Sequence, residues 1–344
     1  MVAVAPAHSG GSYDGRAMAA GLPLSAGSVT ASDAFALPRP GWSHVISHDG
    51  TPIAWCRTDP VRPAAVPRNS RLPVVLCNGI ACSTAYWSTL AHRLHKQRPV
   101  VQWDYRGHGL SGVPFDPDAV TIDHVMADLD AVIGVADAAP AVLIGHSFGV
   151  QVALEAARRW PDRVAAIMAI AGSPGSPLPA RATHPIFGAL SVVERLHAYV
   201  PNRTDEAWRA WWRSPLTHLA ARAVGGTSLA VPPRVMRDYY EHVATREVGL
   251  LLAMMRSMQQ HDASDVVPTL DVPLLALAGD ADHLTPLSVM TRLGLEAPHG
   301  ELAVCHGGSH TLPAEQPEWV LDQMRPWLDQ VDAALRRGGV PAGT

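Results

Sequence analysis

The chain has 344 residues, of which 47% are hydrophobic and 17% charged, so it can bury a sizeable core and lacks the composition of a disordered protein. Its net charge of −4 gives no reason to expect nucleic acid or an anionic membrane surface as a partner. No apolar run approaches the ~20 residues that a membrane helix needs. The N-terminus lacks the charged and apolar regions of a secretion signal, so we expect a cytoplasmic protein.

Cysteine usage agrees with that compartment. The four cysteines are Cys56, Cys77, Cys82 and Cys305. Their spacing matches no zinc pattern, and we expect reduced, buried thiols, with a Cys77–Cys82 pair as the alternative. We expect no metal and no cofactor.

The first half of the chain alternates apolar strand-like runs with helical patterns. Residues 1–40 are rich in Ala, Gly, Ser and Pro and are expected to form a flexible arm. The predicted strands are 43–47, 51–58, 72–77, 99–103, 141–144 and 163–171, and the predicted helices are 85–97, 121–137 and 151–159. This alternation is typical of βαβ units and a mostly parallel sheet flanked by helices.

The alternation stops at Gly172 and resumes near residue 266. Residues 173–265 contain helical patterns near 186–199, 204–213 and 233–260 but no convincing strand. We therefore expect a core of residues 41–172 and 266–338, with a helical cap of residues 173–265 inserted between two core strands. The predicted strands 272–278 and 301–305 and a closing helix 313–337 complete the core, and residues 339–344 form a tail.

The segment Gly145-His146-Ser147-Phe148-Gly149 follows an apolar strand and precedes a helix. This is the arrangement of a nucleophile elbow, in which two glycines allow a sharp turn that exposes the serine hydroxyl. The alternative, a Gly-rich turn that matches the pattern by chance, is weakened by the strand before it and the helix after it.

A serine hydroxyl needs a base, and the base needs an acidic partner. Asp282 and His310 both follow predicted strands, in the chain order Ser, Asp, His. Asp280 competes with Asp282, and His306 with His310, but the favoured residues lie farther past their strands. His146, on the tight turn itself, is interpreted as structural, and His283 as a loop or lid contact.

A tetrahedral intermediate also needs hydrogen-bond donors for its oxyanion. The backbone N–H of Phe148, directly after the serine, is one candidate. Asn78-Gly79-Ile80 follows the strand 72–77, and the backbone N–H of Ile80 is the second candidate. An ordinary Asn-Gly turn is the alternative explanation for this loop.

These motifs together resemble the α/β-hydrolase superfamily, in its serine esterase and lipase-like branch with a helical lid. The resemblance covers most of residues 42–335 and includes Asp104-Tyr105-Arg106-Gly107-His108-Gly109-Leu110-Ser111, whose role in the family is mainly structural. It implies an α/β-hydrolase fold and a Ser147–Asp282–His310 triad. The family usually has His-Gly where this chain has Asn78-Gly79, so we expect a formed but differently tuned oxyanion hole. A serine nucleophile argues against the epoxide hydrolase and haloalkane dehalogenase branches.

Aromatic and apolar residues in the cap and near the elbow are candidates for a substrate pocket. The spacing of Trp208, Trp211 and Trp212 places them on one helical face. The candidate pocket residues are Tyr86, Trp87, Trp208, Trp212, Met254 and Leu284. The alternative for the cap residues is that they only pack the cap onto the core.

The leading functional hypothesis is a serine hydrolase that cleaves an ester or lactone of a small to medium apolar substrate through an acyl-enzyme on Ser147. The alternatives are a thioesterase or acyltransferase, or a C–C bond hydrolase, of secondary metabolism with the same triad, and a non-catalytic ligand-binding protein of this fold. Arginines such as Arg203 could meet the phosphate of a thioester carrier. The sequence does not predict the oligomeric state.

Overall fold

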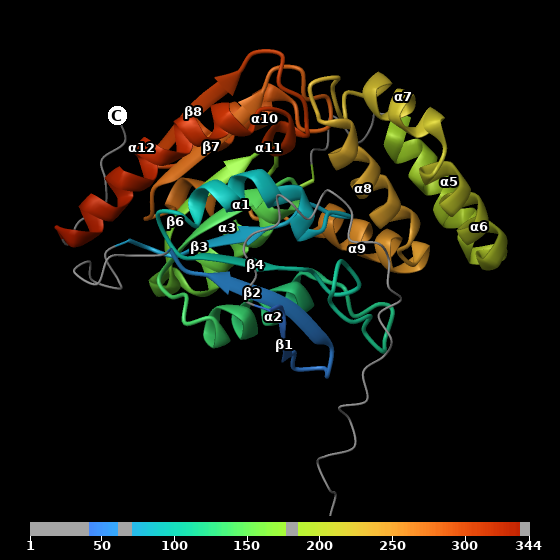
Figure 1. Ribbon diagram of the computed structural model, residues 1–344, viewed down its shortest axis with the longest axis horizontal. Helices are drawn as coiled ribbons and strands as arrows, with labels where there is room; N and C mark the ends of the chain where they lie inside the picture. Colours follow the sequence, from blue (N-terminus) through green and yellow to red (C-terminus); the bar gives the residue numbers. More distant parts are fainter. Residues whose placement is uncertain (1–40, 61–70, 177–184, 338–344) are drawn as a thin grey trace, which may run out of the picture. The chain divides into compact units, whose positions relative to one another are not determined.

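A mixed sheet of eight strands lies at the centre of the computed structural model, which describes residues 41–60, 71–176 and 185–337 (Figure 1). The strand order is β1-β2-β4-β3-β5-β6-β7-β8. The strands are β1 (Ser43–Ile46), β2 (Pro52–Thr58), β3 (Val74–Cys77), β4 (Val100–Trp103), β5 (Ala141–His146), β6 (Val164–Ile170), β7 (Leu274–Gly279) and β8 (Gly300–Cys305). Only the pairings that involve β2 are antiparallel. The mostly parallel sheet predicted from the sequence is therefore confirmed.

Helices cover both faces of this sheet, which explains why its central strands are continuous apolar runs rather than alternating ones. Val142 and Ile144 of β5 point into one core cluster, together with residues of α1 (Ser88–Leu94) and α12 (Pro317–Arg336). Ala141 and Leu143 point into the other, against α2 (Ile122–Val135), α3 (Phe148–Arg159) and α10 (Leu287–Glu296). Every residue of β5 is buried as a result.

Short helices complete the loops at the strand ends. They are the 3₁₀ helices η2 (Thr84–Trp87), η3 (Pro161–Arg163) and η4 (Val267–Thr269) and the short α-helix α11 (Leu312–Glu315). The helix predicted at 85–97 is therefore shorter than expected, with η2 in place of its first turn. The Thr84 amide donates to the buried Asp104 carboxylate at 2.9 Å, a tertiary contact that sets the conformation of this segment.

Among the described residues, five α-helices lie in the chain between β6 and β7, and we call them the inserted helices. They are α5 (Pro185–Tyr199), α6 (Pro201–Trp212), α7 (Pro215–Ala223), α8 (Pro233–Ala244) and α9 (Val248–Gln260). Figure 1 shows them together beyond one end of the sheet. Four of them begin with proline, whose fixed φ suits the first helical position.

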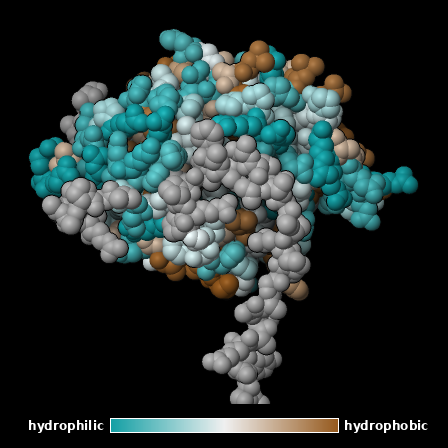
Figure 2. All heavy atoms as spheres, in the orientation of Figure 1, coloured by the Kyte–Doolittle hydropathy of each residue, from teal (hydrophilic) through white to brown (hydrophobic). Residues whose placement is uncertain are grey.

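The inserted helices expose several large apolar side chains. Val192, Leu196, Tyr199, Trp211, Leu216 and Leu219 are all exposed. Figure 2 shows hydrophobic residues gathered at the upper right, over the region where Figure 1 places α7.

The remaining predictions about organisation concern the ends and the cysteines. The predicted arm of residues 1–40 and tail of residues 339–344 lie outside the described residues. All four cysteines are free and buried, as expected. In the part of the chain that the structure describes, no helix is both long and apolar enough to cross a membrane.

Candidate active site

Ser147 lies at the sharp turn between β5 and α3, with φ 54° and ψ −116°, a sparsely populated conformation for a residue with a side chain. The flanking glycines are required by close backbone contacts. A Cβ atom on Gly145 would collide with the backbone of Gly149, and one on Gly149 with the Cys77 carbonyl. The sequence therefore folds at this point into the strained turn that its two glycines predict.

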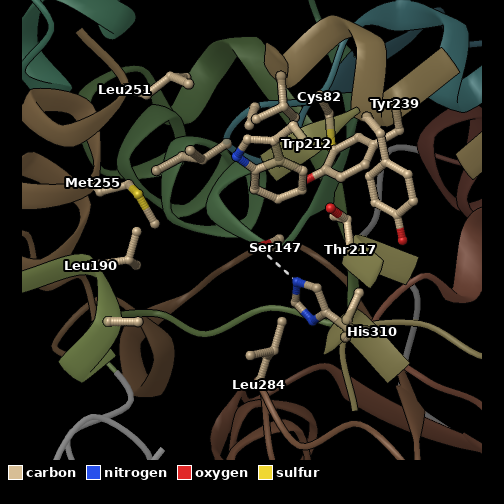
Figure 3. A pocket seen from close by; sticks show the side chains of 18 of the residues that line it. Cys82, Ser147, Leu190, Trp212, Thr217, Tyr239, Leu251, Met255, Leu284 and His310 are labelled. Carbon is tan, nitrogen blue, oxygen red and sulfur yellow. Dashed lines mark hydrogen bonds between the residues drawn. The ribbon is translucent and has the colours of Figure 1, made fainter. Parts of the chain in front are cut away.

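The structure brings Ser147, His310 and Asp282 together. Ser147 Oγ lies 3.1 Å from His310 Nε2 (Figure 3), and His310 Nδ1 lies 3.0 Å from Asp282 Oδ2. The Asp282 side chain is 1% exposed, and its other oxygen accepts the amides of Leu284 and Thr285, each at 2.8 Å. A carboxylate on Nδ1 favours the tautomer whose Nε2 lone pair faces the serine hydroxyl.

Asp280 and His306, the competing acid and base, form a pair of their own. His306 Nδ1 lies 2.9 Å from Asp280 Oδ2, and the His306 side chain is 92% exposed. The hydrogen bond from His306, with that from the Gly307 amide, lowers the pKa of Asp280. Neither side chain has a hydrogen bond with Ser147, whereas His310 bonds to Ser147 and Asp282 bonds to His310.

His146 supports the His310 loop from the interior. Its side chain is buried, and its Nε2 donates to the His310 carbonyl at 2.9 Å. Its ring stacks on Tyr86 with centroids 5.0 Å apart. Burial lowers its pKa to about 3, to which the nearby His310 adds, so it is neutral at physiological pH. The structural interpretation of His146 fits these contacts.

Asn78, which stands where the family usually has histidine, anchors its loop to neighbouring residues by hydrogen bonds. Its Nδ2 donates to the Trp103 carbonyl at 2.9 Å, its Oδ1 accepts the Trp87 indole N–H at 2.6 Å, and its carbonyl accepts the Tyr105 hydroxyl at 2.8 Å. The loop that carries Ile80 is thereby fixed.

The residues of the two candidate oxyanion donors, Ile80 and Phe148, line the same cavity as Ser147. Phe148 is the first residue of α3, where helical amides have no partner within the helix. Among the described residues, neither the Ile80 nor the Phe148 amide donates to a protein carbonyl or side chain. Both amides are therefore available to an oxyanion.

His108 is a residue of this site that the sequence analysis did not single out. It is buried, its Nδ1 donates to the Arg106 carbonyl at 3.0 Å, and its Nε2 accepts the Ala81 amide at 3.2 Å. Ala81 has a φ of 61°, unfavourable for a residue with a side chain. Burial lowers the pKa of His108 to about 4, which keeps Nε2 available as an acceptor. His108 thus holds the residue next to Ile80 in place.

Arg106 is structural, as the resemblance implies. Its guanidinium is fully buried and lies 2.6 Å from Asp128 and 2.7 Å from Asp49. These bonds fix the backbone that carries His108.

A cavity of about 930 Å³ opens above Ser147, between the loops at the strand ends and the inserted helices. Of the predicted pocket residues, Tyr86, Trp208, Trp212 and Leu284 line it. Trp87 and Met254 do not, so these two predictions are wrong. Trp87 is buried with its indole on Asn78, and Met254 faces the core. Met255 and Met258 of the same helix line the cavity instead.

Metal-ligating side chains come together at one place in the described chain. His48, Asp49 and His124 have potential ligand atoms within 4.8 Å of one another. The Asp49 carboxylate already binds Arg106 and accepts the Thr51 amide at 3.0 Å. His48 and Asp49 lie in the β1–β2 turn and His124 lies in α2, and none of the three lines the cavity.

The chain resembles known hydrolases over most of its length. The family model described as serine aminopeptidase, S33, matches residues 68–317. RutD of Caulobacter segnis, provisionally named a carbamate hydrolase, is 26% identical over 73% of this chain and 89% of its own. The pimeloyl-[acyl-carrier protein] methyl ester esterase of Methylococcus capsulatus is 28% identical over 63% of this chain and 78% of its own. A thermophilic esterase from Thermogutta terrifontis shares the fold, with a TM-score of 0.64 and 24% identity over 85% of this chain and 99% of the esterase.

Proposed function

The chain belongs to the serine aminopeptidase S33 family of α/β-hydrolases, and we propose that within this family it is a serine hydrolase that cleaves an ester or lactone of a small to medium apolar substrate. One observation carries the proposal. Ser147 is hydrogen-bonded to His310, and His310 to Asp282. Ser147 also lines a cavity whose walls are mainly apolar side chains. The names of the esterase relatives are consistent with it.

In the proposed reaction, Ser147 Oγ attacks the carbonyl carbon while its proton passes to His310 Nε2. The carbonyl electron pair moves onto oxygen and gives a tetrahedral oxyanion. This intermediate collapses, the bond to the leaving oxygen breaks, and His310 protonates that oxygen as the alcohol departs. Water then attacks the acyl-enzyme and gives one proton to His310. His310 passes this proton to Ser147 Oγ as the acyl–Oγ bond breaks and the acid leaves.

The other proposed roles follow from the same geometry. Asp282 orients His310 and stabilises its charged form. The Ile80 and Phe148 amides bind the oxyanion, each lowering the barrier by about 3 kcal/mol. We assign residues 173–265 to a cap that closes the cavity and residues 41–172 and 266–338 to the catalytic core.

Hydrolysis of an ester is favoured over removal of an N-terminal amino acid, the reaction in the family's name. An α-ammonium group needs an anionic partner when it is taken out of water. None of the described residues that line the cavity is Asp or Glu. The cavity therefore suits a neutral acyl group.

A thioester substrate is the second candidate, and Arg203 is the observation that favours it. Arg203 is exposed, lines the cavity, and has no acidic partner among the described residues, so it could meet the phosphate of an acyl carrier. Comparing p-nitrophenyl butyrate with butyryl-CoA in wild type and Arg203→Ala separates the two candidates. If Arg203→Ala loses activity on butyryl-CoA but not on p-nitrophenyl butyrate, the result supports a thioester substrate.

The central test is Ser147→Ala. We expect it to reduce kcat for p-nitrophenyl butyrate by at least about 10⁴-fold without unfolding the protein. Ser264→Ala, at an exposed serine, is the matched control and should retain turnover. Unchanged turnover in Ser147→Ala would contradict the proposal. Labelling of Ser147 by a fluorophosphonate without turnover of any ester would favour the non-catalytic ligand-binding alternative.

A further inference from the structure

A short loop carries the base His310. It runs from the end of β8 at Cys305 to the start of α11 at Leu312. Gly307 and Gly308 lie in this loop, and Gly307 has a φ of 73°, so the backbone before His310 has few constraints of its own. Contacts with other segments must therefore fix where the imidazole lies.

Glu315, the last residue of α11, binds the residues on both sides of His310. Its Oε2 accepts the Ser309 amide at 3.2 Å, and it also accepts the Ser309 hydroxyl. The Thr311 hydroxyl lies 3.4 Å from the same oxygen and 3.0 Å from Ser309 Oγ. One carboxylate oxygen thus gathers donors from the residue before the base and from the residue after it.

The Glu315 carboxylate is buried without a basic partner. Glu315 is 6% exposed, and no ion pair within the described residues includes it, whereas the buried carboxylates of Asp128 and Asp332 pair with arginines. A buried carboxylate costs free energy unless other groups compensate its charge. The donors that compensate Glu315 belong to the two neighbours of His310, so the charge lies where it can hold the loop of the base.

Two further contacts of this loop involve neutral groups. His146 Nε2 donates to the His310 carbonyl at 2.9 Å, and burial lowers the pKa of His146 to about 3. The Thr311 hydroxyl lies 3.2 Å from that of Thr227, which is buried in the loop after α7. Glu315 differs from both partners because its bonds are charge-assisted, and such bonds are shorter and stronger than neutral ones.

We propose that Glu315 is a positioning residue for the base of the proposed hydrolysis. It keeps His310 Nε2 within reach of Ser147 Oγ, 3.1 Å away, and of the leaving oxygen. The proposal rests on the proposed function, in which this nitrogen first accepts the serine proton and then protonates the leaving oxygen. Both transfers need hydrogen-bond distances, and a displacement of about 1 Å can cost about 10²-fold in rate. Glu315 does not line the cavity, so it acts through the loop rather than on the substrate.

Two leaving groups of different basicity test this role. p-Nitrophenolate departs almost without a proton, whereas ethoxide must be protonated as it leaves, so hydrolysis of ethyl butyrate depends more on a well-placed His310. Glu315→Ala should lower kcat/KM about tenfold for p-nitrophenyl butyrate and about 10²-fold for ethyl butyrate. The ratio of the two losses does not depend on how much of the enzyme is folded. Equal losses would mean that Glu315 only supports folding, and they would overturn the proposal.

Three further variants separate the hydrogen bonds from the fold. Glu315→Gln keeps an oxygen that can accept from Ser309, so it should recover most of the activity on ethyl butyrate. Ser309→Ala should lower that activity about tenfold in the wild type and little further in Glu315→Ala, because both changes remove one shared contact. It also tests the proposal if Glu315→Ala does not fold. Glu318→Ala, at an exposed glutamate three residues away, is the matched control and should retain both activities. Losses in Ser309→Ala and Glu315→Ala that simply multiply would contradict the proposal.

Failure of this assignment is distinguishable from failure of the proposed function. If the wild type hydrolyses p-nitrophenyl butyrate and Ser147→Ala does not, the proposed function holds whatever the ratio of the two losses is. If no ester is hydrolysed, the rate at which a fluorophosphonate labels Ser147 replaces turnover, because His310 must still accept the serine proton. Slower labelling of Glu315→Ala than of Glu318→Ala supports the positioning role, and equal rates overturn it. A wild type that neither turns over nor labels would overturn both proposals.

Discussion

The sheet region contains fully buried ion pairs, whereas the ion pairs described within the inserted helices involve partly or largely exposed side chains. In the sheet region, Arg98 pairs with Asp332 and Arg106 with Asp128, with every one of these side chains at most 3% exposed. In the inserted helices, Arg213 pairs with Glu241 on the surface, where both side chains are more than half exposed. The inserted helices also present apolar side chains to solvent and to the cavity. The positions of Ser147, His310 and Asp282 are thus fixed in the sheet region. Most of the residues that line the cavity come from the inserted helices and the loops between them.

The largest expected effect is a loss of kcat that distinguishes the Asp282–His310 pair from the Asp280–His306 pair. Asp282→Asn should lower kcat by about 10⁴-fold, because the amide favours the wrong His310 tautomer. Asp280→Asn, in the exposed pair two residues away, is the matched control and should retain wild-type turnover. Steady-state kinetics on p-nitrophenyl butyrate measure both. A large loss in Asp280→Asn, with little loss in Asp282→Asn, would reassign the acid.

The next prediction compares a buried ion pair with an exposed one. Arg106→Met leaves the Asp128 carboxylate, which is 0% exposed, without its guanidinium and should lower the free energy of unfolding by about 3–5 kcal/mol. Arg213→Met, in the exposed pair of the inserted helices, should cost less than about 1 kcal/mol. Urea unfolding measures both. If both variants lowered the free energy of unfolding equally, the buried ion pair of the sheet region would matter no more than the exposed pair of the inserted helices.

His108 tests whether the sheet region positions the oxyanion loop. His108→Ala frees the Ala81 amide and should lower kcat by about 10²-fold with little change in KM, because the loop donor acts mainly on the transition state. His108→Gln offers an amide oxygen to Ala81 and should recover part of the rate. If both variants lose only stability, His108 has no positioning role.

The smallest effect concerns pH and a histidine at the boundary between the regions. Burial lowers the pKa of His242 to about 3, with His108 and Arg246 adding to the shift, and burial lowers those of His146 and His108 to about 3 and about 4. The unfolded chain binds these protons first, so stability should fall as pH drops from about 6.5 toward 4. Asp104, whose pKa burial raises to about 6, acts in the opposite direction, since the stability it contributes is lost as pH rises through that value.

Burial also lowers the pKa of His92, His124 and His261 and raises the pKa of Asp128 and Glu301. Six histidines against three carboxyls therefore give a net loss of stability in acid. His242→Gln should reduce the loss between pH 7.5 and pH 5 by about 1–2 kcal/mol in urea unfolding. His306→Gln, at an exposed histidine, is the control. A wild-type protein more stable at pH 5 than at pH 7.5 would contradict this sign.

The fold and the Ser–His–Asp geometry could be predicted because they depend on local patterns. The runs of apolar residues predict the buried strands, and the glycines around Ser147 are dictated by backbone contacts within the turn. Trp87 and Met254 could not be placed, because periodicity shows that a helix face is apolar but not whether it meets the core or a cavity. Successive helical residues differ by about 100°, so Met254 faces the core while Met255 faces the cavity.

Contacts between distant segments that no sequence motif marks also escaped prediction. The hydrogen bond between His108 and Ala81 joins the loops that follow β4 and β3. No spacing of residues in the sequence predicts this bond. The shortened helix α1 likewise reflects contacts of Thr84 and Trp87 with residues on neighbouring strands and loops.

The placement of the inserted helices between β6 and β7 bears on how this scaffold can diversify. The backbone leaves the sheet after one strand and returns at the next, so residues 185–260 can change while the strand register and the Ser147–His310 distance are kept. Most of the residues that line the cavity belong to this one stretch between β6 and β7. New substrate ranges could therefore arise by mutation or exchange of a single contiguous stretch, which makes the scaffold readily evolvable.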